Sequence, residues 1–221
     1  MRQGNDSRHN CRVHWIEKDG LRLPKPVGGH PALDFCNTWA GWGEQLPDVD
    51  DSRREWLNSF DELVEWAALV GLLEHDRSAT LRAEADHSPR LATAVLTRAR
   101  LLRRAVHDAV LDPADEAALV GVDREVRRAG AMVRLLPTSA GAAARWVVPE
   151  DAGLDQPVLA AAWSAAALLT SPEVATVASC PGVECGWVFL DKRGRRRWCD
   201  MATCGNRAKV AAHARRAKAR L

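Results

Sequence analysis

The sequence has no tyrosine, only three phenylalanines and little lysine, since arginine supplies 26 of its 31 basic residues. It also lacks the short motifs that are typical of several enzyme classes, namely a nucleophile elbow, a phosphate-cradling glycine loop and a His-Glu-x-x-His pair. These absences favour a binding protein over an enzyme. We therefore predict no catalytic residues.

Long apolar runs are missing as well. No stretch approaches the roughly 18 consecutive apolar residues of a membrane helix, so we expect a soluble protein without a membrane partner. Residues Met1 to Ser7 contain no apolar segment that could act as an export signal, and we expect the chain to stay in the reducing cytoplasm. With 221 residues, of which 47% are hydrophobic, the chain has room for one ordinary globular domain and a small appendage.

Four of the six cysteines lie near the C-terminal end at a spacing that repeats. Four residues separate the members of each pair, thirteen residues separate the pairs, and the cysteines are Cys180, Cys185, Cys199 and Cys204. Two thiolates at this spacing can hold one tetrahedral ion, and the middle segment is long enough for a hairpin that brings the pairs together.

Glycine follows the second cysteine of each pair, as Gly186 and Gly205. We expect positive φ angles at both, because such a turn lets backbone N–H groups face a thiolate sulfur. Disulfides or simple buried thiols are the alternatives, but disulfides belong to oxidising compartments. The sequence therefore predicts one structural zinc ion per chain, and zinc binding would supply most of the folding free energy of so small a module.

Charge is divided unevenly along the chain. Residues 191–221 contain eleven basic and two acidic side chains, a net charge of +9, whereas the other 190 residues contain 20 basic and 27 acidic side chains, a net charge of −7. A small basic metal module on an acidic body is typical of nucleic-acid binders, because Lys and Arg that neutralise phosphates release condensed counterions. The alternative is a basic tail that only docks on the acidic body or raises solubility.

Two runs in the last part of the chain, CPGVECGWVFLD (180–191) and RRWCDMATCGNR (196–207), resemble the CGNR zinc-finger family, and GHPALDFCNT (29–38) resembles the start of the ABATE domain that usually precedes this finger. The resemblance covers almost the whole chain. Members are described as stress-linked bacterial transcription regulators, which implies DNA binding and leaves the chemistry of the upstream domain open. Asp200 departs from the family pattern, in which we expect a small hydroxyl residue. The departure weakens the basic field slightly and leaves the four cysteines untouched.

We expect a mainly α fold in two parts. Residues 1–178 should form a helical ABATE-like domain, with 1–22 flexible and a short β-hairpin made of 132–136 and 145–148. Residues 179–221 should form a CGNR-type finger, a treble-clef-like or zinc-knuckle module of one β-hairpin and one helix. No low-complexity linker separates the parts, so the finger should pack against the body.

Capping signals and proline positions locate the helices of the body. They predict helices at 31–39, 59–71, 76–86, from Pro89 to about Val110, from Pro113 to about Gly130 and at 157–168, followed by a short one from Pro172.

Within the finger, Trp187, Phe189 and Trp198 should form the core of a hairpin whose turn lies at 192–195. A helix should follow from about Asn206, with the last zinc thiolate at its positive N-terminal end. Its basic residues form one stripe at i, i+4, i+7 and i+11. The predicted nucleic-acid-binding residues are Arg193, Arg195, Arg196, Arg197, Asn206, Arg207, Lys209, His213, Arg216 and Arg220.

A second candidate site lies in the ABATE-like part. Asp34 and Asn37 are three residues apart on one helix face and could line a ligand pocket together with His30. The alternative, which we favour, is that Asp34 and Asn37 brace a neighbouring loop through hydrogen bonds to its backbone.

The leading hypothesis is a zinc-dependent DNA-binding transcription regulator whose helical body senses a small-molecule effector or forms a homodimer. One alternative is an enzyme or ligand-binding protein with the finger as a structural cap. Another is an RNA-binding or protein-docking adaptor. Steep weakening with salt distinguishes nucleic-acid binding from small-molecule turnover.

Overall fold

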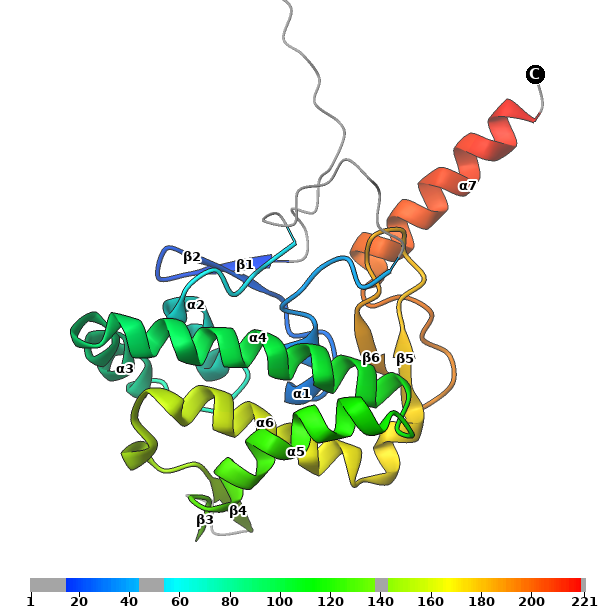
Figure 1. Ribbon diagram of the computed structural model, residues 1–221. Coiled ribbons are helices and arrows are strands. Elements are labelled where there is room, and N and C mark those ends of the chain that lie inside the picture. Colours follow the sequence, from blue (N-terminus) through cyan, green and yellow to red (C-terminus); the bar gives the residue numbers. More distant parts are fainter. Residues whose placement is uncertain (1–14, 44–53, 138–142, 220–221) are drawn as a thin grey trace, which may run out of the picture.

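The computed structural model describes residues 15–43, 54–137 and 143–219, and helices dominate this part of the chain (Figure 1), as the sequence predicted. The helices are α1 (Pro31–Cys36), α2 (Phe60–Leu69), α3 (Arg77–His87), α4 (Pro89–Leu111), α5 (Glu116–Gly130), α6 (Gln156–Leu169) and α7 (Asn206–Lys218). Shorter helical turns occupy Glu150–Asp155, Pro172–Thr176 and Met201–Gly205. The strands are β1 (Trp15–Lys18), β2 (Leu21–Pro24), β3 (Arg134–Pro137), β4 (Ala144–Val147), β5 (Val177–Ser179) and β6 (Val188–Leu190).

The helix boundaries follow from local capping chemistry. The Ser59 hydroxyl accepts a hydrogen bond from the Glu62 N–H, and the Glu62 carboxylate accepts one from the Ser59 N–H, so both groups satisfy free donors at the start of α2. Asp115 caps α5 by accepting from the Ala118 N–H at 3.0 Å. The Ser59 cap was readable in the sequence. Helix α5 begins at Glu116 and not at the predicted Pro113, because Asp115 caps it.

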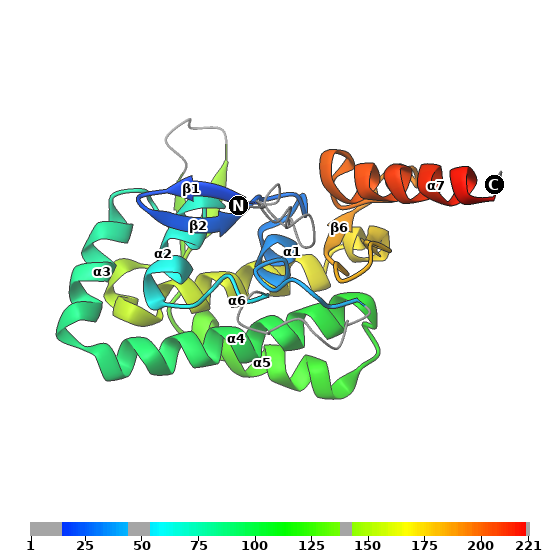
Figure 2. The ribbon, with the colours of Figure 1, turned by 90° about the horizontal axis from the view of Figure 1, so that it is seen from above.

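Helix α6 forms the centre of the body. It packs against α1, α4 and α5, and Figure 2 shows it between the other elements. Val158, Ala161, Ala162 and Ala165 are completely buried. Their small side chains let the neighbouring helices approach closely, so a helix rich in alanine can serve as the core of the domain. No helix in the described ranges is both long and apolar enough to cross a membrane.

The expectation that residues 1–22 are flexible is wrong for 15–22. Strand β1 pairs with β2 in an antiparallel hairpin, and Asp19 and Gly20 form its turn with φ angles of 50° and 77°. An Asp-Gly pair is a strong hairpin signal, and the following strand contains the fully buried Leu23. Residues 1–14 lie outside the described part of the chain.

The predicted hairpin between α5 and α6 is present. Strand β3 pairs with β4 in the register Arg134 to Val147 and Pro137 to Ala144, within a residue or two of the predicted segments. The expected turn falls at 138–142, outside the described residues.

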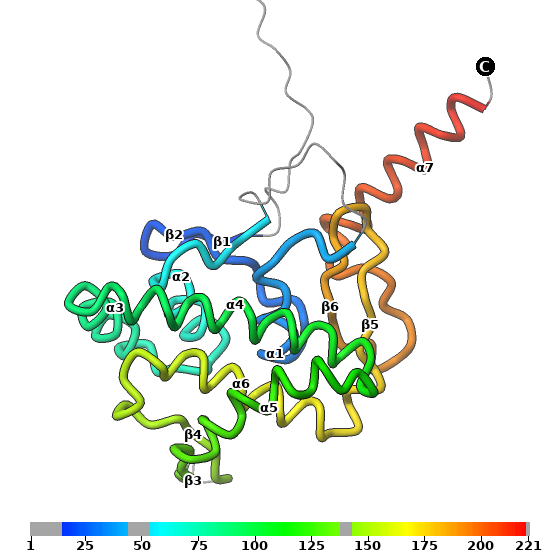
Figure 3. The backbone as a smooth tube through the Cα atoms, viewed as in Figure 1, coloured from blue at the N-terminus to red at the C-terminus, as the bar shows by residue number. Residues whose placement is uncertain are grey.

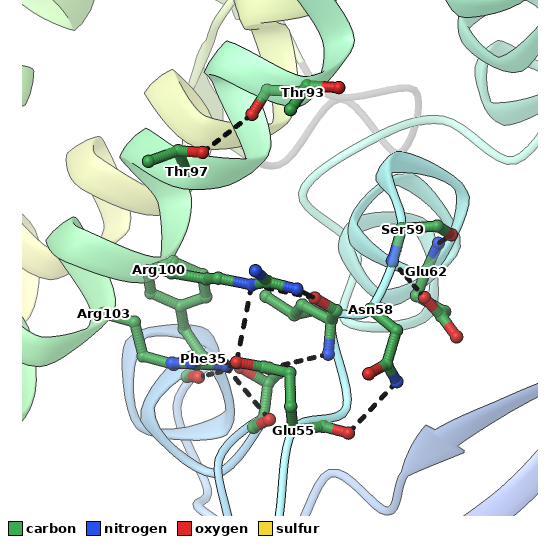
Figure 4. A network of polar contacts seen from close by, with 11 residues as sticks. Phe35, Glu55, Asn58, Ser59, Glu62, Thr93, Thr97, Arg100 and Arg103 are labelled. Atoms are coloured by element: carbon green, nitrogen blue, oxygen red, sulfur yellow. Dashed lines mark hydrogen bonds and ion pairs between the residues drawn. The ribbon is translucent and has the colours of Figure 1, made fainter. Parts of the chain in front are cut away.

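A buried ion pair ties α4 to the segment that follows α1. The Arg103 guanidinium makes two 2.6 Å hydrogen bonds to the Glu55 carboxylate (Figure 4). It also donates to the carbonyl and the hydroxyl of Thr38, at 3.1 and 3.0 Å. Arg103 is only 4% exposed, so its charge depends on these partners for stabilisation.

Replacing Arg103 by leucine should lower the free energy of unfolding by about 3 kcal/mol, because Glu55 loses its main partner. The loss stays at the lower end of the usual range, since Arg100 remains 3.5 Å from Glu55. Urea denaturation measures the effect. Arg127→Leu is the matched control, because the Arg127–Asp123 pair is fully exposed and its removal should change stability little. Equal losses in the two variants would contradict the prediction.

Candidate metal centre and nucleic-acid interface

The four cysteines of the repeated pairs meet in one buried cluster. Their sulfur atoms all lie within 4.8 Å of one another, and the Sγ atoms of Cys185 and Cys204 lie 3.6 and 3.7 Å from that of Cys199. Four thiolates at about 2.3 Å around a tetrahedral zinc ion would lie about 3.8 Å apart, whereas a disulfide requires about 2.05 Å. The cysteines are therefore positioned to hold one zinc ion, as the sequence predicted.

The ionisation of these thiols also fits a metal site. Hydrogen bonds from Cys185 and Cys199 lower the pKa of the Cys180 thiol to about 7. Hydrogen bonding to Cys180, together with burial, raises the pKa of the Cys185 and Cys199 thiols far above the usual range. Cysteine binds zinc as the thiolate, so a bound cation would offset the negative charges of four thiolates in this buried cluster. Four protein thiolates fill a tetrahedral zinc ion completely, so the metal would be structural.

The two glycines that follow a cysteine differ in role. Gly186 has the expected positive φ, 63°, and a Cβ there would lie 2.4 Å from the backbone nitrogen of Gly43. Gly205 does not have it, which corrects the expectation: its φ is −63°, within the helical range. A Cβ at Gly205 would lie 2.8 Å from the sulfur of Met201, whose flexible and exposed side chain can move aside. Only Gly186 is needed for its backbone conformation.

The finger contains the predicted β-hairpin, but with another strand pairing. Strand β6 pairs with β5, in the register Val177 to Leu190 and Ser179 to Val188, so the hairpin closes around the first cysteine pair. The 192–195 turn lies at the far end of β6 from these cysteines and follows the hydrogen bond from the Asp191 N–H to the Thr176 carbonyl. The turn and α7 therefore lie at opposite ends of the β5–β6 pair, and zinc does not place them side by side. Figure 3 traces this path.

Trp187 and Phe189 are buried with the four cysteines, and Trp198 packs against them partly exposed. This is the predicted aromatic core of the finger. The indole N–H of Trp187 donates to the Trp39 carbonyl at 2.9 Å, which fastens the core to the body.

Among the loop arginines predicted to bind nucleic acid, Arg196 alone is partly buried. Its guanidinium donates to the carbonyls of Val27, Trp198 and Cys199, and lies 4.2 Å from the centre of the Phe189 ring. These contacts hold the loop to the body and leave Arg196 as a structural residue. The other three arginines of the loop, Arg193, Arg195 and Arg197, are exposed.

Helix α7 carries the remaining predicted residues and projects away from the body (Figures 1 and 2). It buries none of its residues along its described length. Asn206, Arg207, Lys209, His213 and Arg216 are all exposed on it, whereas Arg220 lies outside the described residues. The basic stripe is therefore open to solvent.

Asp200, the departure from the family pattern, caps the turn that leads into α7. Its carboxylate accepts a hydrogen bond from the Ala202 N–H at 2.8 Å. A hydroxyl residue would supply the same acceptor, so the substitution keeps the cap.

Two protein-family models match the chain in the predicted order. The model described as "Putative stress-induced transcription regulator", ABATE, matches residues 29–172, and that of the CGNR zinc finger matches residues 177–217. The chain belongs to the ABATE family. No curated protein matches it.

The start of the ABATE region holds the three residues of the second candidate site. Asn37 is completely buried: its carbonyl accepts from the Val188 N–H and its amide donates to the Val188 carbonyl, both at 2.9 Å. Asp34 accepts from the Gly28 N–H at 2.7 Å, and His30 caps α1 through a 3.2 Å bond from the Ala32 N–H. These side chains act as braces. The nearby surface hollow, about 440 Å³, is lined by Gly29 and by loop residues from 190 to 196 instead.

Trp42 is a supporting residue of the finger that the sequence reading missed. Its indole donates to the Cys36 carbonyl at 2.9 Å and stacks on His107 of α4, with ring centres 3.8 Å apart. A Cβ at Gly186 would lie 2.7 Å from Trp42, so the cysteine turn rests on this residue. In the sequence, the glycines on either side of Trp42, Gly41 and Gly43, were the signal that another segment packs closely against this one.

Metal removal should unfold the finger and leave the helical body folded. Protein purified without added metal should contain one zinc per chain by elemental analysis, because four thiolates complete one site. Chelation should disorder the finger, as shown by increased exposure of tryptophan to solvent, while far-ultraviolet circular dichroism retains most of the helical signal. A metal content near zero, or native disulfides, would contradict the assignment.

Asp34 should make stability depend on pH. Burial raises its pKa to about 6, against the opposing hydrogen bonds from Gly28 and Val27. The pKa of Asp34 is higher in the folded than in the unfolded state, so its protonation stabilises the fold. This contribution to the free energy of unfolding is complete below pH ~4 and is lost as the pH rises through ~6. Between these values, wild-type stability should fall relative to Asp34→Asn by up to about 3 kcal/mol. Urea denaturation at matched zinc content measures this difference, and a constant difference across the range would contradict it.

Proposed function

We propose that this ABATE protein is a zinc-dependent DNA-binding regulator of transcription, in which the CGNR finger holds a basic helix against the duplex. The observation that carries the proposal is α7 itself. The helix contains five basic residues and no acidic one, and it buries no side chain within the chain.

An isolated helix of this length is marginal in water, and its like charges repel one another. A polyanion removes both problems, because its phosphates neutralise the basic side chains and its groove provides a packing surface. The major groove of DNA admits one α-helix. Helix α7 should therefore be more stable when bound to a duplex than when free in water.

The zinc ion would fix the start of α7, because Cys204 lies in the turn that leads into the helix. Lys209 and Arg216 would contact phosphates, and the neutral side chains of Asn206 and His213 are placed to contact base edges. Most of the binding free energy would then come from phosphate contacts and would depend steeply on salt.

The body would modulate this activity. The family description motivates a role in the stress response, with the ABATE region binding a small-molecule effector or a second copy of the chain. Such a regulator acts where bacterial chromosomal DNA lies, in the cytoplasm. His30, Asp34 and Asn37 are occupied by brace contacts, so an effector would bind elsewhere in the ABATE region.

The arginines of the loop provide a matched test of DNA binding. Arg197→Ala should reduce the slope of log affinity against log salt by about one and leave the melting temperature unchanged, because Arg197 is exposed. The double variant Lys209→Ala/Arg216→Ala should reduce it by about two. Arg196→Ala should instead lower the melting temperature, since it removes hydrogen bonds to three carbonyls.

The measurement is a titration of labelled duplex at several salt concentrations. Arg90→Ala, an exposed substitution on α4, is the control and should leave the slope unchanged. Absence of binding at low salt, or unchanged slopes in the α7 variant, would contradict the proposed function.

A further inference from the structure

The loop that follows β6 is organised around a carboxylate. Asp191 accepts a 2.9 Å hydrogen bond from the Arg195 N–H on its side chain and a 3.1 Å one from the Gly194 N–H on its carbonyl. Its own N–H donates to the Thr176 carbonyl at 2.8 Å. The chain turns at Gly194, where φ is 63°. This set of hydrogen bonds fixes the path of the loop and ties its start to Thr176.

The Asp191 carboxylate also stays ionised. Backbone N–H groups, that of Arg196 first and those of Arg195, Arg193 and Gly194 as well, hold its pKa below the usual range. The negative charge is therefore used to orient backbone donors in the middle of a basic segment.

The cationic side chains of the loop are left on its surface. Lys192, Arg193 and Arg195 are exposed and line the 440 Å³ hollow. Gly29, Leu190, Asp191 and Arg196 complete its lining. Lys192 forms a 2.5 Å ion pair with Glu173 of the body, and this pair anchors one edge of the hollow. The lining thus combines two exposed arginines, Arg193 and Arg195, with a hydrogen-bonded backbone turn.

We infer that the loop from Asp191 to Arg197 is a second phosphate-binding surface, separate from α7, whose shape Asp191 maintains. Its partner would be the sugar–phosphate backbone of a nucleic acid. The inference rests on the proposed function and adds a second point of contact to it. The two surfaces lie at opposite ends of the β5–β6 pair, so one duplex would be held along the finger rather than at a single spot.

The inference predicts a change in DNA affinity opposite to the one that charge alone predicts. Removing an acidic residue from a basic surface should tighten DNA binding if charge alone matters. Asp191→Ala should instead weaken binding about three- to tenfold and reduce the salt slope by about one, because the loop loses its hydrogen-bond acceptor and its arginines lose their arrangement. Asp191→Asn should bind at least as tightly as the wild type, since its amide oxygen still accepts.

Glu173→Gln is the matched control. Glu173→Gln removes an exposed negative charge beside the same loop. Glu173 contacts the loop through the Lys192 side chain, and the glutamine oxygen can still accept that hydrogen bond. The substitution should tighten binding a few-fold, as charge alone predicts. Tightening by Asp191→Ala equal to that by Glu173→Gln would overturn the inference.

A triple variant covers the case in which Asp191→Ala fails to fold or loses zinc. Lys192→Ala/Arg193→Ala/Arg195→Ala removes the exposed side chains and keeps the backbone turn. It should reduce the salt slope by about two to three at unchanged zinc content. An unchanged slope would overturn the inference.

Two further measurements separate the possible failures. Inorganic phosphate should displace labelled duplex no better than chloride does at equal ionic strength. Strong competition by phosphate at low millimolar concentration would make the hollow a small-anion site. That result would overturn the assignment to a nucleic-acid backbone. Failure of the wild type to bind any duplex at low salt would overturn the proposed function itself. Wild-type binding whose slope changes only in the α7 variants would overturn the loop inference alone.

Discussion

The pair of hydrogen bonds between Asn37 and Val188 joins the two parts of the protein. Asn37 extends the edge of β6 as a neighbouring strand would, and the Gly28 carbonyl accepts from the Leu190 N–H one step further along. Loss of the Asn37 amide would leave a buried N–H and a buried carbonyl unpaired, at about 1–3 kcal/mol each. The finger therefore depends on the ABATE region for part of its structure.

Strand β6 belongs to two cores at once. Val188 and Leu190 are buried with the side chains of the helical body, whereas Phe189 is buried with the cysteine cluster. Because successive side chains of a strand face opposite sides, a three-residue strand can fill both cores. The finger is thus a continuation of the body, which explains why no flexible linker precedes it.

The sequence predicted features that depend on local chemistry and missed those that depend on distant contacts. Cysteine spacing identified the zinc ligands, and caps such as Ser59 located the helices, because the interacting groups lie within a few residues of each other. The pairing of β6 with β5 was missed, since the alternation in 187–190 does not say which strand lies alongside. Arg196 was counted as a surface charge because composition gives its charge but not the three carbonyls that it binds.

The shared strand limits how the body could control the finger. A ligand changes DNA affinity only if it binds two arrangements of the protein with different affinity. A small displacement of α1 would act on Val188 through Asn37, and the adjacent Trp187 and Phe189 would carry the change to the cysteine cluster and the start of α7. The cysteine cluster lies on the opposite face of the same strand, where bound zinc would stabilise it. An effector in the ABATE region and the zinc ion would consequently be coupled energetically, each altering the affinity of the protein for the other.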